Sequence, residues 1–187
     1  VSDVSTAIRQ GATGVMLSGE TASGKYPVES VQTMSRIAVS TEQGLQSSDL
    51  KPESATRFKS TRAVAHAGVE LAKMAGASRI LVATERGNAP RLVSSYRPGI
   101  PVTAVTDSLV TARRIQILSG VDSVIVEEYE RGSKTMQNAI ALQLDSGKVQ
   151  PGDKIVAISG SPKAISGLTS TARLYKISNS GEIVGTE

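Results

Sequence analysis

Residues 79–106 read RILVATERGNAPRLVSSYRPGIPVTAVT, and this stretch decides the fold. Two runs rich in apolar residues, Arg79–Thr84 and Val102–Thr106, have the length and the β-branched composition of buried strands. Between them, Ala89–Tyr96 has the composition of a short helix, which Pro98 ends. A strand, a helix and a second strand in this order predict parallel strands joined by a helical crossover.

The same alternation extends to both sides of this stretch. An amphipathic helical pattern covers Thr61–Ala75, and Ser108 is a favourable N-cap for a helix that runs to Leu118 and is closed by Gly120. The later segments are a strand at Ser123–Glu127, a helix at Ser133–Leu144, and strands at Lys154–Ser159 and Ala172–Ile177. The last strand follows with no room for a helix, so it is predicted to be antiparallel and at an edge. The predicted fold class is α/β, an open five-stranded, mostly parallel sheet with helices on both faces.

The first 45 residues form a separate pattern. A helix is predicted up to Gln10, then a short buried strand at Gly14–Leu17 and a polar loop at Ser18–Thr21. Pro27 then occupies a favourable first position for another helix. We therefore expect a first unit over 1–45, a polar linker over 46–60, the main α/β domain over 61–178 and a frayed tail over 179–187.

Composition excludes several classes of site. The chain has 187 residues with no cysteine and one histidine, His66, so neither a thiolate metal site nor a histidine-based triad is expected. We interpret His66 as an ordinary helix residue. The net charge of +4 is dispersed, and the longest basic run is Arg113-Arg114, so no nucleic-acid interface is predicted. Arg79 and the other scattered basic residues are interpreted as solvated faces.

The sequence also bears on location. No apolar stretch has the length of a membrane span, and no signal-peptide pattern opens the chain, so we expect a cytoplasmic protein without a membrane partner. The chain starts at Val1 without an initiator methionine, and we interpret it as an excised fragment.

Residues 14–27, GVMLSGETASGKYP, are the most specific segment. They resemble the block that closes the catalytic barrel of pyruvate kinases, and Ser2–Ala12 resembles the helix before that block. Three later parts of the chain resemble further blocks of the same family: Pro90–Pro98 with Pro101–Thr106, Gly152–Val156 and Ser166–Thr171. The resemblance implies that residues 1–45 are the end of a catalytic (β/α)8 barrel and that residues 61–178 are the C-terminal regulatory domain.

The resemblance also implies an activity. Pyruvate kinases transfer a phosphoryl group from phosphoenolpyruvate to ADP, giving pyruvate and ATP, and they use Mg²⁺ and K⁺. The family's motifs for the charge-stabilising groups do not occur in these residues, so metal ligands are expected upstream and the fragment is expected to be inactive alone. Ser18 and Glu20 would border the active site in a supporting role. The family forms tetramers, so the expected partners are the remainder of the chain and further copies of it.

Two loops predict an anion site. The loop Thr84–Asn88 precedes a helix, whose free N–H groups and dipole attract anions, and Ser166–Thr171 is a turn rich in hydroxyl groups. The resemblance implies an allosteric site for a phosphorylated effector formed by Thr84, Glu85, Arg86, Gly87, Asn88, Lys163, Ser166, Gly167 and Thr169. The negative charge of Glu85 disfavours fructose 1,6-bisphosphate. A sugar monophosphate, AMP, or no effector at ordinary polar turns remain as alternatives.

The alternative function is that of a free-standing sugar-phosphate or nucleotide sensor domain. Such a sensor would have no use for the polar loop at Ser18–Thr21. A nucleic-acid-binding module fits less well, because basic residues are dispersed and aromatic residues make up 3% of the chain.

Overall fold

The computed structural model describes residues 1–45, 59–129, 133–160 and 168–185 of the chain. It divides into two compact units, Val1–Lys51 and Pro52–Glu187, which are described separately. In the described residues, no helix is long and apolar enough to cross a membrane.

The described residues of the first unit contain three helices. They are α1 (Ser2–Arg9), α2 (Gly19–Ala22) and α3 (Pro27–Gln43), and α1 packs against α3. Pro27 begins α3 as expected, because its missing N–H and fixed φ suit the first turn of a helix. The buried residues of these helices are Ile8 in α1 and Thr41 in α3.

The strand predicted at Gly14–Leu17 is wrong. These residues have no regular secondary structure, and the Met16 side chain is 86% exposed. A strand needs a hydrogen-bonded neighbour to satisfy its backbone. The described part of the first unit holds no other strand, so this apolar run has nothing to pair with.

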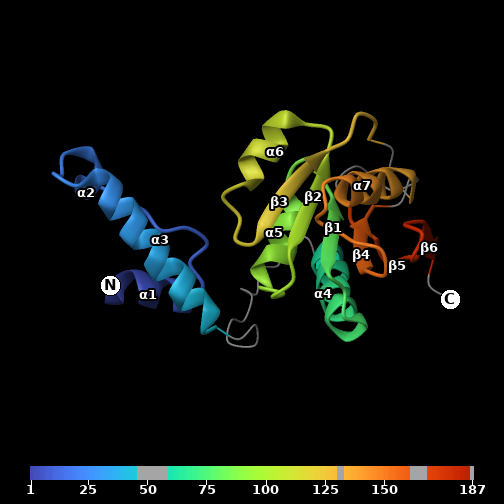
Figure 1. The fold of residues 1–187 in the computed structure, drawn as a ribbon, viewed down its shortest axis with the longest axis horizontal. Helices are drawn as coiled ribbons and strands as arrows, with labels where there is room; N and C mark the ends of the chain where they lie inside the picture. The colour runs from blue at the N-terminus through green and yellow to red at the C-terminus, as the bar shows by residue number, and fades with distance from the viewer. Residues whose placement is uncertain (46–58, 130–132, 161–167, 186–187) are drawn as a thin grey trace. The chain divides into compact units, whose positions relative to one another are not determined.

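The second unit is built on a six-stranded sheet with the order β3-β2-β1-β4-β5-β6 (Figure 1). The pairs β1–β2, β2–β3 and β1–β4 are parallel, and β4–β5 and β5–β6 are antiparallel. The strands are β1 (Arg79–Ala83), β2 (Val102–Thr106), β3 (Val121–Ile125), β4 (Lys154–Ser159), β5 (Thr171–Ile177) and β6 (Ile183–Gly185). The helices are α4 (Lys59–Ala75), α5 (Asn88–Ser95), α6 (Leu109–Ile115) and α7 (Ser133–Asp145).

Helices cover both faces of this sheet, which confirms the predicted fold class. Alternate residues of β1 point to opposite faces: Ile80 and Val82 pack in one apolar cluster, and Leu81 packs in the other. The first cluster takes its helical residues from α4, α5 and α6, and the second takes them from α7. Gly68 lets α4 lie close to the sheet, because a methyl group there would come within 2.5 Å of Ile158 Cδ1.

The structure corrects the far edge of the sheet. The sequence predicted five strands, with the strand at Ala172–Ile177 at the edge and a frayed tail from Asn179. The last strand is antiparallel as expected, but Ile183–Gly185 pairs with it as a sixth strand and takes the edge. The third strand begins at Val121, two residues before the predicted Ser123.

Candidate functional site

The order of the strands reverses between β1 and β4. From β1 the chain continues to β2 and β3 on one side, whereas β4 pairs with the other side of β1. In open α/β sheets, ligands bind outside the carboxyl ends of the strands at such a reversal. Two of the loops that the sequence singled out follow these two strands. The Cα partners Val82 and Ile158 show that the strands run level just before the loops begin.

The loop after β1 is held by one buried and one partly buried hydrogen bond. The Gly87 N–H donates to the Thr84 hydroxyl at 2.8 Å, and the Thr111 hydroxyl donates to the Glu85 carbonyl at 2.9 Å. Gly87 has φ +85°, a backbone conformation that favours glycine, and it is the N-cap of α5. No side-chain hydrogen bond caps this helix start. Arg86 is exposed beside it.

The loop after β4 is described only in part. Thr169 is buried, and its N–H donates to the Thr61 hydroxyl at the start of α4 at 3.4 Å. Gly160 is required where the loop begins, because a methyl group there would lie 2.6 Å from the Leu168 carbonyl oxygen. The predicted site residues Lys163, Ser166 and Gly167 lie outside the described residues.

Ser18 and Glu20 lie at the start of α2 in the first unit, and both are exposed. The Ser18 N–H donates to Glu20 Oε2 at 3.0 Å, and Thr21 donates through its N–H and its hydroxyl to the Ser18 carbonyl, each at 3.2 Å. The backbone N–H groups of Glu20 and Ser18 lower the pKa of the Glu20 carboxyl, because they favour its charged form. The carboxylate is therefore ionised and accepts hydrogen bonds from the backbone at the start of α2.

These residues do not suggest a metal centre. In the described part of the chain, no group of three or more His, Asp or Glu residues is placed to hold a metal ion. Glu20 is a lone carboxylate among hydroxyl and backbone groups, which does not fit the donor set of a divalent cation.

Sequence reasoning missed a polar cluster at the opposite end of the sheet. Arg79 was interpreted as solvated, but its side chain is 11% exposed, and its Nη1 lies 2.8 Å from the Thr103 hydroxyl and 3.3 Å from Asp122 Oδ2. Lys148 Nζ lies 2.7 Å from the same Asp122 oxygen. The three charged residues lie far apart in the sequence, so no local pattern indicates that they meet. The cluster lies at the amino ends of β1–β3, away from the carboxyl ends where ligands bind.

Known proteins resemble this chain over nearly its whole length. A pyruvate kinase of Staphylococcus epidermidis (strain RP62A) is 38% identical over 179 residues, which cover 94% of this chain and 30% of that protein. A pyruvate kinase of Staphylococcus aureus (strain USA300) is 36% identical over 197 aligned residues, which cover 99% of this chain and 34% of that protein. The chain therefore spans about a third of the length of the curated relatives it matches.

Solved structures agree with this similarity. A crystal structure of a pyruvate kinase from Cryptosporidium parvum has a TM-score of 0.78 at 29% identity, over 94% of this chain and 35% of that one. A second Cryptosporidium parvum structure, in complex with ADP, has a TM-score of 0.71 at 29% identity, over 94% of this chain and 36% of that one. Residues 62–175, more than half of the chain, match the family model of the pyruvate kinase alpha/beta domain, and the chain belongs to the pyruvate kinase family.

Proposed function

We propose that this chain is the C-terminal portion of a pyruvate kinase, which transfers a phosphoryl group from phosphoenolpyruvate to ADP and gives pyruvate and ATP. The observation that carries the proposal is the similarity to a named pyruvate kinase over 99% of this chain. The chain spans about a third of such relatives, so the rest of the enzyme supplies the remaining parts of the active site. A free-standing sensor domain is not favoured, because the relatives named above are pyruvate kinases.

The second unit would be the regulatory and subunit-contact domain of a cytoplasmic, tetrameric enzyme. The transferred phosphoryl group is highly anionic, and bound Mg²⁺ and K⁺ would neutralise part of its charge. The described residues do not fit these ions, so their ligands would belong to the remainder of the enzyme. The isolated chain should therefore show no turnover of phosphoenolpyruvate with ADP and Mg²⁺. Measurable turnover by the isolated chain would contradict this assignment.

Ser18 and Glu20 would support the reaction at the border of the active site. Both side chains are exposed in this chain, so they are accessible to a substrate or to the rest of the barrel. In the enzyme that carries this segment, Ser18→Ala or Glu20→Ala should lower kcat by about one to three powers of ten, as for lost proton-transfer support. Ser23→Ala is the matched control, since Ser23 is also exposed and its hydroxyl donates to the Gly19 carbonyl in α2 at 3.4 Å. Unchanged kinetics in both variants would remove these residues from the active site.

The loops that follow β1 and β4 would bind a phosphorylated effector. The uncapped start of α5 beside exposed Arg86 supports anion binding there. Calorimetric titration with fructose 1,6-bisphosphate, glucose 6-phosphate, ribose 5-phosphate and AMP should show saturable binding of at least one. Glu85→Ser should tighten this binding by removing a like charge, and Lys163→Ala should weaken it by about 1–3 kcal/mol. If none of the four binds at millimolar concentration and Glu85→Ser does not rescue binding, these loops are surface turns.

A further inference from the structure

The turn that carries Ser18 and Glu20 is closed by its own backbone. Four consecutive N–H groups donate to two carbonyls at the start of the turn, over 2.9–3.2 Å: those of Thr21 and Ala22 to Ser18, and those of Ser23 and Gly24 to Gly19. Every residue from 18 to 26 is exposed. The shape of this turn therefore depends on its own backbone more than on a buried core.

Gly24 brings the end of the turn against the main chain of Glu20. A methyl group at position 24 would come well within 3.0 Å of the Glu20 carbonyl oxygen and would lie 3.0 and 3.1 Å from the Glu20 carbonyl carbon and Cα. These atoms belong to the backbone, so rotation of a side chain cannot relieve the overlap. At Gly14 and Gly19 of the same segment, the corresponding space is open. A side chain at position 24 is therefore incompatible with this shape of the turn.

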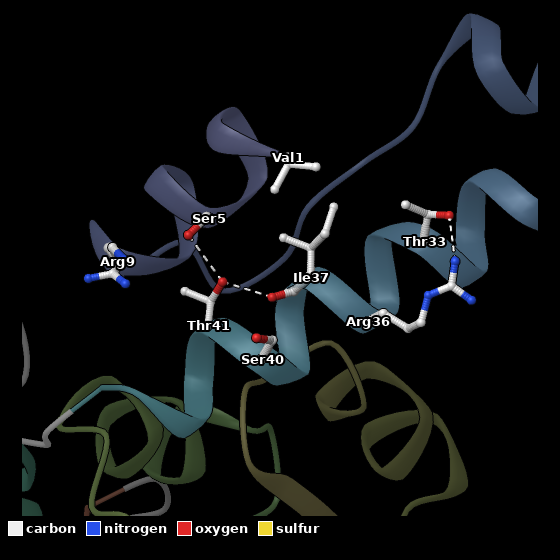
Figure 2. Close-up of a pocket in the computed structure, with 8 residues that line it drawn as sticks. All are labelled: Val1, Ser5, Arg9, Thr33, Arg36, Ile37, Ser40 and Thr41. Atoms are coloured by element: carbon white, nitrogen blue, oxygen red, sulfur yellow. Dashed lines mark hydrogen bonds between the residues drawn. The ribbon is translucent and has the colours of Figure 1, made fainter.

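The helices before and after this segment are fixed to each other. Beside the hollow shown in Figure 2, the Thr41 hydroxyl of α3 lies 3.1 Å from the Ser5 hydroxyl of α1 and 2.7 Å from the Ile37 carbonyl. Because α1 and α3 are joined in this way, an overlap at position 24 has to be relieved within the turn itself, where Glu20 lies.

The same turn also directs the carboxylate of Glu20. Glu20 Oε2 accepts a hydrogen bond from the Ser18 N–H at 3.0 Å, and only one residue separates the two. The hydrogen bonds that lower the pKa of this carboxyl come from the backbone of Ser18 and of Glu20 itself. A shift of the Glu20 main chain would change the geometry of these bonds directly. The direction of the carboxylate therefore depends on the backbone that Gly24 touches.

We propose that Gly24 is a positioning residue, which lets the chain close over Glu20 and so directs the Glu20 carboxylate at the border of the active site. This inference rests on the function proposed above for Ser18 and Glu20. Gly24 has no side chain and acts through Glu20, without a contact to substrate. A methyl group at position 24 would move the Glu20 main chain by roughly 0.5–1 Å, and a misplacement of about 1 Å can lower a catalytic rate about a hundredfold.

Kinetics of the enzyme that carries this segment test the role. Gly24→Ala should lower kcat about tenfold to a hundredfold. The KM for phosphoenolpyruvate should change less than about threefold, because the role proposed for Glu20 lies in proton transfer rather than in substrate binding. Gly14→Ala is the matched control, since Gly14 is also exposed and its added methyl group would meet open space. Its kcat and KM should equal those of the wild type.

A double variant tests whether the loss acts through Glu20. When Glu20→Ala is already present, adding Gly24→Ala should lower kcat by less than about threefold further, since the carboxylate that Gly24 directs is absent. A residue that only stabilised the fold would lower kcat equally in both backgrounds.

NMR of the full 187-residue chain reports on Glu20 without any activity. In ¹³C-labelled protein, the Glu20 carboxyl is assigned by the signal that Glu20→Gln removes. Gly24→Ala should raise the pKa of this carboxyl toward its ordinary value and shift the Ser18 amide, because the hydrogen bonds that favour the charged form are weakened. Gly14→Ala should leave both signals unchanged.

The results distinguish a failure of this positioning role from a failure of the proposed function. If Glu20→Ala lowers kcat but Gly24→Ala keeps the wild-type kcat or the wild-type pKa of Glu20, the positioning role alone is overturned. Equal losses from Gly24→Ala in the two backgrounds, or an equal loss from Gly14→Ala, also overturn it. Wild-type kcat in Glu20→Ala removes the function proposed for Glu20, and the positioning role with it.

Discussion

Asp122→Asn would remove the carboxylate that Arg79 and Lys148 share. Asp122 Oδ2 lies 3.3 Å from Arg79 Nη1 and 2.7 Å from Lys148 Nζ, and Oδ1 accepts a hydrogen bond from the Thr103 hydroxyl at 2.5 Å. Asparagine keeps the shape of the side chain and loses its charge. The largely buried Arg79 guanidinium would then have no anionic partner in this cluster.

The expected loss of unfolding free energy follows from how exposed Arg79 and Asp122 are. Breaking a buried ion pair costs about 3–5 kcal/mol, whereas an exposed pair contributes about 0–1 kcal/mol. Arg79 is 11% exposed but Asp122 is 36% exposed, so solvent screens part of the interaction. We expect the variant to lose about 2 kcal/mol of unfolding free energy, between these limits. Glu70→Gln is the control, because it breaks an exposed pair with Lys73 at 3.4 Å and should cost less than about 1 kcal/mol.

Urea unfolding, monitored by circular dichroism, measures the unfolding free energy of both variants. An m-value equal to that of the wild type shows that these free energies can be compared.

Desolvation raises the pKa of Asp122, but hydrogen bonds from Lys148 and Thr103 and the charge of Arg79 outweigh it and keep the pKa below its ordinary value. A carboxyl group with a depressed folded pKa stabilises the fold above its unfolded pKa and loses this contribution as the pH falls through the folded value. The difference between wild type and variant should therefore hold from pH 7 to about pH 5 and shrink below about pH 4. A cost equal to that of Glu70→Gln, or a difference that acid leaves unchanged, would refute the reasoning.

Three further substitutions test local packing and capping. Gly68→Ala would place a methyl group 2.5 Å from Ile158 Cδ1, and overpacking of about 1–3 kcal/mol should exceed a gain of about 1 kcal/mol in helix propensity. Its thermal midpoint should fall, and adding Ile158→Val, which removes that Cδ1, should recover part of the loss; a rise in the single variant would contradict the close contact. Ser108→Ala removes the hydroxyl that accepts the Thr111 N–H at 3.2 Å, and urea titration should show a loss of about 1 kcal/mol, whereas unchanged stability would mean that the cap contributes nothing. Gly87→Ala forces a side chain to adopt φ +85°, at a cost of about 1–2 kcal/mol, and NMR should show shifted amides at the start of α5; an unperturbed spectrum and midpoint would count against strain at this turn.

Strands in the middle of the sheet could be predicted from the sequence because their signals are local. Val102–Thr106 and Lys154–Ser159 have the predicted bounds, since each is a continuous run of residues that the sheet buries almost completely. Ile183–Gly185 was missed because three residues carry too little pattern and form a strand only beside β5. Gly14–Leu17 failed for the converse reason, since it has the pattern of a strand but no partner in the described part of its unit.

The candidate site residues also divide into those that a local sequence pattern indicates and those that depend on contacts with distant segments. Thr84 and Gly87 could be assigned to a loop between a strand and a helix start, because both flanking elements are local. The hydrogen bond from Thr111 to the Glu85 carbonyl could not be predicted, because it depends on how α6 packs beside that loop. Contacts between distant segments are set by packing, which the sequence pattern does not specify.

The central position of β1 has a consequence for the order of folding. Its pairing with β2 joins residues about 20 positions apart, such as Ile80 and Val102, whereas its pairing with β4 joins Ile80 to Val156, more than 70 positions later. Closing the longer loop costs more chain entropy before any contact is gained. We therefore expect β1, β2 and β3 to assemble early and the β4–β5–β6 ribbon to dock last. During synthesis, the inner edge of β1 stays unpaired until β4 has been made, which makes this edge the place where premature association with other chains begins.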